Sequence, residues 1–264
     1  MDQKKLALVI GGANGIGAAC SRLMVERGWR VVIGDMDIET AQQLAAEIGG
    51  QAFATDVSSM AAMDQLAAKI EEEIGPVASL VVSSGTFQQN VPVAKTPLDV
   101  WERIMAVNLD GTYFANRAFG TRMAARGFGS IVNVASLAGI GSSPLHAYGP
   151  SKAAVIHLTQ CLAGEWGRAG VRVNCVAPGL TLVPRVLARF EAGGRYASDP
   201  DAHMALGRCV EPIEVAEGIE FLASDRASAI TGINLIIDAG WLTASTWELY
   251  GGVRPAPNPG VTPE

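Results

Sequence analysis

Short apolar runs alternate with longer segments in which apolar residues recur at helical spacing, along almost the whole chain. Several short runs are continuously apolar, which is typical of parallel strands covered on both faces. The repeated strand–helix order predicts right-handed crossovers, and therefore an α/β fold in one domain, with a doubly wound parallel sheet between two layers of helices. The predicted strands are Leu6–Ile10, Arg30–Gly34, Ala52–Thr55, Ser79–Val82, Ser130–Ala135, Val171–Val176 and Ile233–Ile237.

The segments between the strands predict helices. The longest, Pro97–Arg126, carries a start signal, with Thr96 as the expected N-cap and Pro97 in the first helical position. The long helices have more apolar surface than one sheet face can cover, which predicts an interface with other copies of the chain. The predicted helices are Ile16–Arg27, Ala41–Ile48, Met60–Ile74, Pro97–Arg126 and Ala147–Gly167.

Two stretches depart from the alternating pattern. Residues 181–211 are irregular and include Gly193-Gly194 and Asp199-Pro200, so we expect a substrate lid between the last two strands. Residues 243–264 form a C-terminal tail whose proline content predicts an extended or mobile chain.

Composition narrows the class of protein. Apolar residues make up 49% of the 264 residues and charged residues 17%, which favours a deep core over a disordered chain. A net charge of −6 argues against a nucleic-acid surface. We expect no membrane span, and the first residues lead straight into a predicted strand without a signal-peptide pattern. These features predict a cytoplasmic protein that acts on a small molecule.

The four cysteines show no paired spacing and no histidine partners at metal-ligand distance. We therefore expect no metal site, and buried free thiols in a reducing compartment. The cysteines are Cys20, Cys161, Cys175 and Cys209.

A glycine-rich turn follows the first predicted strand and opens the first helix. Its glycines are Gly11, Gly15 and Gly17, with Asn14 and Ile16 between them. Glycines let the backbone turn tightly and approach a pyrophosphate, which binds the free N–H groups at the positive end of a helix. The turn predicts a dinucleotide site.

Acidic residues end the second and third strands. The Asp35 carboxylate would accept hydrogen bonds from both hydroxyls of an adenine ribose and would repel a 2′-phosphate, while Met36 offers no cation for one. We therefore predict NAD as the cofactor, although Asp35 could also be a cap or turn residue. Asp56, followed by Val57, could hold the adenine or could equally cap the next helix.

Tyr148 and Lys152 carry the predicted chemistry. Four residues apart, they lie on one face of a helix, and a lysine ammonium would lower the pKa of the phenol from about 10 toward neutrality. A phenol of that pKa can serve as general base for an alcohol. Alone, such a pair is an ordinary feature of a helix surface. Ser136, at the end of an upstream apolar run, strengthens the interpretation.

Together these motifs resemble the short-chain dehydrogenase/reductase family over roughly residues 5–241. The resemblance implies a seven-stranded Rossmann sheet, a nicotinamide cofactor and a homotetramer. It also implies that Tyr148 exchanges the substrate proton, that Ser136 binds the substrate oxygen, and that Lys152 assists Tyr148 and holds the nicotinamide ribose. Asn108 would anchor a water beside Lys152. Further implied cofactor contacts are Ser84, Gly85, Pro178, Gly179 and Thr181.

Alternatives remain for two of these residues. Asn108 could bond its own helix backbone, and Ser136 could cap a turn. The chain also departs from the family pattern at three places. Ile10 stands where the family usually has Thr, Val82-Ser83-Ser84-Gly85 replaces Asn-Asn-Ala-Gly, and Val183 replaces a cofactor-binding Thr.

The predicted reaction is hydride transfer between NAD⁺ and a secondary alcohol, either a polyol, a sugar alcohol or a cyclic or hydroxy compound, or reduction of the corresponding ketone. Candidate substrate contacts are Gln88, Leu137, His146 and Leu180, although His146 could simply begin a helix. The alternatives are an epimerase or dehydratase on the same extended fold, and a non-enzymatic dinucleotide-binding regulator.

Overall fold

The computed structural model describes residues 5–191 and 199–254. Seven strands form one parallel sheet in the order β3-β2-β1-β4-β5-β6-β7. The predicted seven strands are confirmed with ends shifted by a few residues at most, because almost every residue of β1, β4, β5 and β6 is buried. The strands are β1 (Leu6–Ile10), β2 (Arg30–Asp35), β3 (Gln51–Ala54), β4 (Val77–Val82), β5 (Gly129–Val134), β6 (Val171–Pro178) and β7 (Asn234–Ile237).

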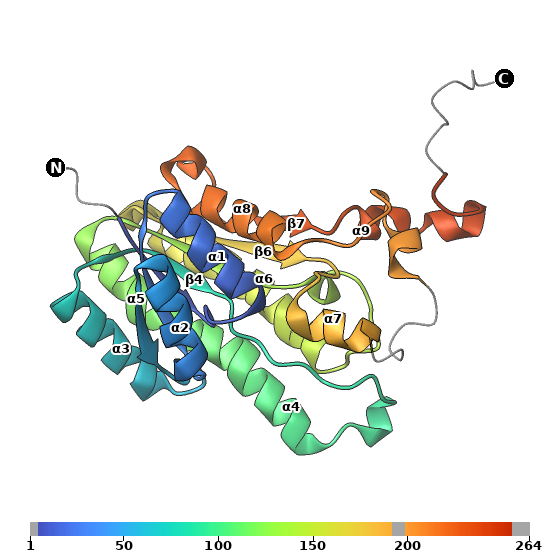
Figure 1. Cartoon of the computed structure of the whole chain (residues 1–264), viewed down its shortest axis with the longest axis horizontal. Helices are drawn as coiled ribbons and strands as arrows, with labels where there is room; N and C mark the ends of the chain where they lie inside the picture. The colour runs from blue at the N-terminus through green and yellow to red at the C-terminus, as the bar shows by residue number, and fades with distance from the viewer. Residues whose placement is uncertain (1–4, 192–198, 255–264) are drawn as a thin grey trace.

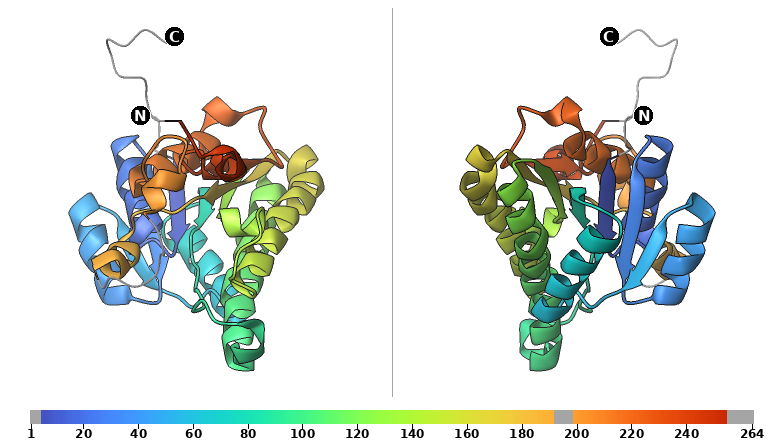
Figure 2. Two further views of the ribbon diagram at one scale, coloured as in Figure 1. Left: turned by 90° about the vertical axis from the view of Figure 1, so that its right-hand side faces the viewer. Right: turned by 90° about the vertical axis from the view of Figure 1, so that its left-hand side faces the viewer.

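Helices cover both faces of this sheet (Figures 1 and 2). One core cluster lies between the sheet and α1 (Gly15–Glu26), α2 (Ile38–Ile48) and α8 (Pro212–Ala223). A second cluster lies between the other face and α3 (Met60–Glu73), α5 (Gly111–Arg126) and α6 (Tyr148–Trp166). The doubly wound architecture predicted from the sequence is therefore confirmed.

The predicted helix Pro97–Arg126 is one run with an irregular centre. It consists of α4 (Leu98–Met105), a π-helical turn η2 (Ala106–Asp110) and α5. The expected cap was wrong: Pro97 is the N-cap residue, and the buried Thr96 hydroxyl makes no hydrogen bond within the described residues. A π turn rotates the residues after it, and such turns are frequent at functional sites.

The irregular stretch after β6 contains local structure. Thr181 pairs with Val210, and α7 (Pro184–Glu191) and the short η5 (Pro200–His203) lie between them. Gly193-Gly194 of the predicted lid lie outside the described residues, as do residues 255–264 of the predicted tail.

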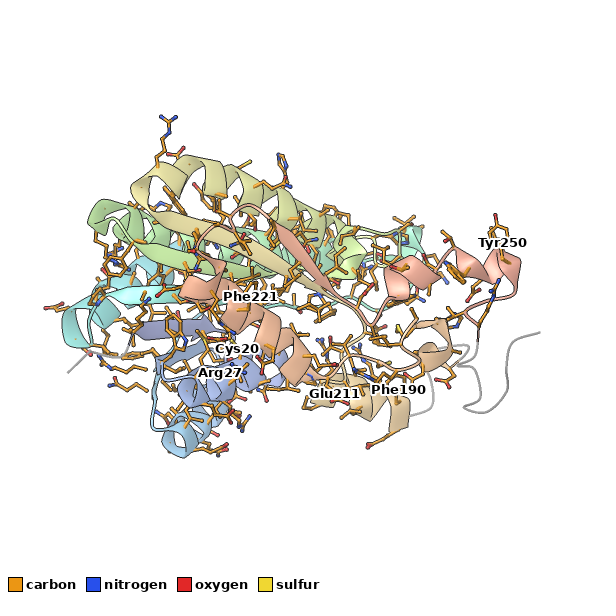
Figure 3. All side chains as sticks on the ribbon, turned by 90° about the horizontal axis from the view of Figure 1, so that it is seen from above. Cys20, Arg27, Phe190, Glu211, Phe221 and Tyr250 are labelled. Atoms are coloured by element: carbon orange, nitrogen blue, oxygen red, sulfur yellow. The ribbon has the colours of Figure 1, made fainter. Side chains whose placement is uncertain are left out.

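The described part of the tail contains short helices. It forms α9 (Trp241–Ala244) and η7 (Trp247–Tyr250), and the His203 ring contacts the Glu248 carboxylate. Tyr250 is 87% exposed and projects from the end of the molecule (Figure 3). The remaining short helices are η1 (Val93–Lys95), η3 (Leu137–Gly139), η4 (Gly167–Ala169) and η6 (Asp225–Ala227).

The cysteine prediction holds for three of the four thiols. Cys20, Cys175 and Cys209 are buried, but Cys161 is exposed because it lies on the outward side of α6. All four are free thiols, and burial raises the pKa of Cys20 to about 12. Among the described helices, none is long and apolar enough to cross a membrane.

Candidate functional site

The sheet changes its winding direction between β1 and β4, which are neighbours although two strands separate them in sequence. In open α/β sheets, ligands bind outside the carboxyl ends of the strands at such a point. Here the two loops touch: Ser83 donates its N–H to Ile10 O at 2.8 Å. The predicted motifs lie around this edge.

Two glycines of the glycine-rich turn, Gly11 and Gly17, have no room for a side chain. Gly11 and Gly15 have φ of +72° and +54°, a region that disfavours other residues. A Cβ on Gly17 would lie 2.0 Å from Gly11 O, and one on Gly11 would lie 2.6 Å from Ser84 N. Asn14 is the N-cap of α1, yet its side chain accepts no hydrogen bond from the first turn. The N–H groups at this helix start therefore fit a phosphate group.

Asp35 lies beside the turn at the end of β2. Its carboxylate accepts hydrogen bonds from Ala13 N at 3.0 Å and from Asp37 N at 3.1 Å. These bonds orient the carboxylate and leave lone pairs for a ligand. The neighbouring Met36 is 59% exposed. The geometry fits a carboxylate that binds a ribose at the end of the second strand.

Asp56 makes a local turn and does not cap α3. Its Oδ1 accepts from the N–H of Ser58 at 2.9 Å and from its hydroxyl at 2.6 Å, and these bonds lower the pKa of the carboxyl group. The N-cap of α3 is Ser59, which accepts from Ala62 N. Val57 is buried against Gly111.

Tyr148 and Lys152 are both buried at the start of α6. The Lys152 Nζ lies 5.8 Å from the centre of the Tyr148 ring and donates a hydrogen bond to Val134 O at 2.8 Å. Burial, which leaves Lys152 only 3% exposed, lowers its pKa from 10.5 to about 8. The predicted pair is thus in the site rather than on a solvated helix surface.

Asn108 connects three segments around this pair. It lies in the π turn η2, where its Oδ1 accepts from Thr86 N at 2.8 Å and its Nδ2 donates to Thr86 O and Ser151 Oγ. The alternative in which Asn108 bonds its own helix backbone is therefore wrong. A Cβ on Gly85 would lie 3.7 Å from both Asn108 Oδ1 and Lys152 Nζ. Gly85 thus faces both side chains, and Ser84 lies against Gly11.

Ser136 follows β5 and begins the short helix η3. Its hydroxyl accepts a hydrogen bond from Ala138 N at 3.2 Å, so it does act as a cap. The O–H donor remains available for a substrate oxygen, because an accepting hydroxyl can still donate. Leu137, the next residue, is buried.

The candidate substrate contacts differ in position. His146 is exposed and Leu180 is partly exposed. Gln88 is 3% exposed, and its oxygen already accepts hydrogen bonds from Ala147 N and Tyr148 N. Its side chain folds inward onto α6, and its role as a substrate contact stays a prediction.

The loop after β6 reaches over the glycine-rich turn. Gly179 N donates to Ile237 O at 2.9 Å, directly after Pro178, and the Thr181 hydroxyl donates to Gly179 O. A Cβ on Gly15 would lie 3.2 Å from Val183, so this valine lies against the turn. Thr181 is therefore near the position expected for a cofactor contact, but it is tied to its own loop.

Two residues of the site have no signal in the sequence. The Phe87 ring stacks on the Tyr148 ring with 4.4 Å between centres and 22° between planes. The Arg185 guanidinium of α7 lies 3.7 Å from the centre of the Phe87 ring, and must occupy the opposite face. Only the folded chain brings these three residues together, so local patterns could not have identified them.

Comparisons with known proteins agree with this geometry. A family model described as enoyl-(acyl carrier protein) reductase matches residues 11–242. The chain is 38% identical to D-threitol dehydrogenase of Mycolicibacterium smegmatis, over 90% of this chain and 92% of that protein. It is 39% identical to galactitol 2-dehydrogenase (L-tagatose-forming) of Cereibacter sphaeroides, over 89% and 94%.

Two solved structures share the fold closely. A protein of Brucella melitensis named ribose-5-phosphate isomerase is 44% identical, with a TM-score of 0.93 over 96% of this chain and 98% of that one. A protein described as a short chain dehydrogenase/reductase family protein is 36% identical, with a TM-score of 0.82 over 92% and 100%.

Proposed function

The chain belongs to the short-chain dehydrogenase/reductase family of oxidoreductases, and we propose that it is an NAD-dependent dehydrogenase of secondary alcohols. The observation that carries the proposal is the buried Tyr148–Lys152 pair at the carboxyl edge of the sheet, beside Asn108. A buried ammonium 5.8 Å from a phenol ring has no packing advantage over an apolar residue, but it does serve proton transfer.

A nicotinamide dinucleotide fits the residues that are present. The turn at Gly11–Gly17 leaves no space for side chains at Gly11 and Gly17 and opens a helix, and Asp35 ends the next strand. When bound, this cofactor accepts or supplies the hydride. Tyr148 takes the hydroxyl proton of the alcohol, Ser136 donates a hydrogen bond to the same oxygen, and Lys152 stabilises the phenolate by its charge. In the reverse direction, Tyr148 returns the proton to a ketone oxygen.

NAD rather than NADP is proposed from Asp35 and Met36. A carboxylate at this place accepts hydrogen bonds from ribose hydroxyls and repels a phosphate dianion. One relative, of Listeria innocua, is named NAD-dependent glycerol dehydrogenase and is 34% identical over 90% of this chain. It supports this choice.

The proposed substrates are polyols, sugar alcohols or cyclic hydroxy compounds. The named relatives act on threitol and galactitol, which are acyclic polyols. Around the proposed reaction centre, Leu137 and Leu180 offer apolar contact, and the Ser136 hydroxyl offers a donor. Residues 181–211 would act as a lid over this space.

An isomerase is the second candidate, because the structure of 44% identity carries that name. An aldose–ketose isomerase moves hydrogen within one substrate and leaves the nicotinamide cofactor unchanged overall. An epimerase or dehydratase of this fold would also restore its cofactor, and a regulator would only bind it. Net formation of NADH from NAD⁺ and an alcohol therefore separates the proposed function from each of these.

We further propose a cytoplasmic homotetramer built from single-domain subunits, with contacts through α4, α5 and α6. Leu98 and Trp101 of α4 and Tyr113 of α5 are exposed apolar residues on these helices. Exposed apolar patches of this kind mark interfaces. Light scattering of the purified protein should give four times the subunit mass, and a monomer at micromolar concentration would contradict the assembly.

The experiment that tests the function is a panel of alcohols and polyols with NAD⁺ at mildly alkaline pH, followed by NADH absorbance. A panel of ketones with NADH, and ribose 5-phosphate with a ketose assay, complete it. Steady NADH formation with at least one alcohol supports the proposal. Isomerisation without NADH formation would replace it.

A further inference from the structure

The side-chain amide of Gln88 holds the start of the helix that carries Tyr148. Its Oε1 accepts hydrogen bonds from the N–H groups of Ala147 at 2.6 Å and Tyr148 at 3.0 Å. Backbone N–H groups only donate, so the oxygen must face them and the identity of the two amide ends is fixed. Ala147 precedes α6 and has no side chain that could cap it.

We propose that Gln88 is a positioning residue for Tyr148, which fixes the backbone of the phenol and keeps negative charge away from it. This inference rests on the proposed role of Tyr148 as the proton-exchanging group. Gln88 itself contacts neither the Tyr148 hydroxyl nor the substrate alcohol in the proposed reaction.

The origin of this cap is unusual. Helix N-caps are ordinarily supplied by the residue that directly precedes the helix. Here the cap comes from the loop after β4, 60 residues before Tyr148 in sequence. The preceding residue, Phe87, stacks on the Tyr148 ring. Two consecutive residues of one loop therefore hold both the backbone and the ring of Tyr148.

The choice of an amide costs stability. The Gln88 Nε2 is buried and has no hydrogen-bond partner within the described residues, and an unpaired buried N–H group is unfavourable. The start of a helix favours negative charge, so a glutamate would cap α6 at least as well. A cap selected for stability alone would therefore be acidic.

Negative charge at this place would oppose the chemistry. Two cationic side chains lie close to this aromatic pair: Lys152 beside the Tyr148 ring on the same helix, and Arg185 over the Phe87 ring. Each can carry positive charge, which favours the phenolate. A carboxylate at position 88 would be almost fully buried and poorly screened, and would raise the pKa of the phenol.

Three variants test the inference. Gln88→Glu keeps the acceptor and adds charge, Gln88→Leu removes the acceptor, and Gln89→Glu adds the same charge at the exposed neighbouring position. For each we would measure the pH dependence of kcat and kcat/KM for an alcohol from the panel, the affinity for NAD⁺, and thermal unfolding. Ultraviolet absorbance of tyrosinate provides a readout without substrate, because Tyr148→Phe identifies its share among the four tyrosines.

We expect Gln88→Glu to unfold at or above the wild-type temperature. The acid limb of its pH–rate profile and the titration of its Tyr148 should nevertheless move up by about one pH unit. That is the size expected for a like charge about 7 Å away, the length of a tyrosine side chain, at an effective dielectric constant of about 40. Gln88→Leu should lower kcat about tenfold or more with NAD⁺ affinity retained, because misplaced reacting groups lose rate. Gln89→Glu should leave the acid limb of the pH–rate profile close to that of the wild type.

The outcomes separate this inference from the proposed function. Suppose that Tyr148→Phe inactivates the enzyme, but Gln88→Glu shifts neither the pH–rate profile nor the Tyr148 titration. That result overturns the role of Gln88 and leaves the proposed function standing. If Gln88→Leu instead lowers stability, NAD⁺ affinity and kcat together, the cap is merely structural. That result also overturns the role of Gln88 as a positioning residue. If Tyr148→Phe remains active, the proposed function fails first.

Discussion

Replacing Lys152 with methionine should make the protein more stable while removing its activity. The ammonium is 3% exposed, and burial lowers its pKa from 10.5 to about 8. A difference of that size between unfolded and folded chains corresponds to about 3 kcal/mol of destabilisation where the lysine is charged in both states. Methionine has a similar length and no charge, so Lys152→Met removes this cost.

Part of the gain is offset by a lost hydrogen bond. Lys152 donates to Val134 O, and leaving that buried carbonyl without its partner costs about 1 kcal/mol or more. We therefore expect a net stabilisation of about 1–2 kcal/mol near neutral pH. Urea unfolding of the nucleotide-free protein, at equal concentration for both proteins, measures it.

The pH dependence gives the sharper test. The folded protein releases this proton near pH 8, whereas the unfolded chain retains it up to about pH 10.5. Between these values the unfolded state binds more protons, so wild-type stability should rise with pH relative to Lys152→Met. Below about pH 8 the cost is fully present and the difference should be constant. A variant that is less stable than wild type at neutral pH, with no relative rise, would refute the reasoning.

Three further predictions concern the pair Asp35 and Met36, Gly17, and Ala239. Asp35→Ser combined with Met36→Arg should shift the coenzyme preference, measured as kcat/KM, toward NADP. Met36→Arg alone should shift it less, because the Asp35 carboxylate remains. A native preference for NADP would contradict our interpretation of Asp35. Gly17→Ala should abolish NAD⁺ binding measured by calorimetry, since its Cβ would meet Gly11 O at 2.0 Å. Gly167→Ala, directly after α6 and with nothing within 4 Å of the added Cβ, should leave NAD⁺ binding unchanged. Ala239 has a φ of +53°, so Ala239→Gly should stabilise the protein by about 1 kcal/mol in urea unfolding, and a destabilised variant would show that this conformation is not strained.

The fold could be predicted well because its signals are local. Continuous apolar runs, glycine turns and amphipathic periods can each be recognised within a few residues. The apolar runs arise because the strands are buried on both faces of the sheet. The Tyr148–Lys152 spacing and the Gly11–Gly17 turn are local in the same sense. The structure accordingly places both at the same edge of the sheet.

The features that the sequence did not predict are those that depend on contacts between distant segments. Thr96 has the sequence of a cap, but its hydroxyl makes no hydrogen bond within the described residues. The π turn at Asn108 has no separate signal in a long helical pattern. Nothing local indicates that Gln88 caps a helix 60 residues later. Its contacts with α6, like the stacking of Phe87 and Arg185, depend on tertiary packing that local propensity does not encode.

The most direct test of the central claim is Tyr148→Phe. Phenylalanine retains the ring that stacks on Phe87 and removes only the hydroxyl, so folding and NAD⁺ affinity should stay close to wild type. With an alcohol that the wild-type enzyme oxidises, turnover should fall by about 10²–10⁴-fold, the usual contribution of general acid–base catalysis. A Tyr148→Phe protein that binds NAD⁺ normally and oxidises that alcohol at near wild-type rate would contradict the account.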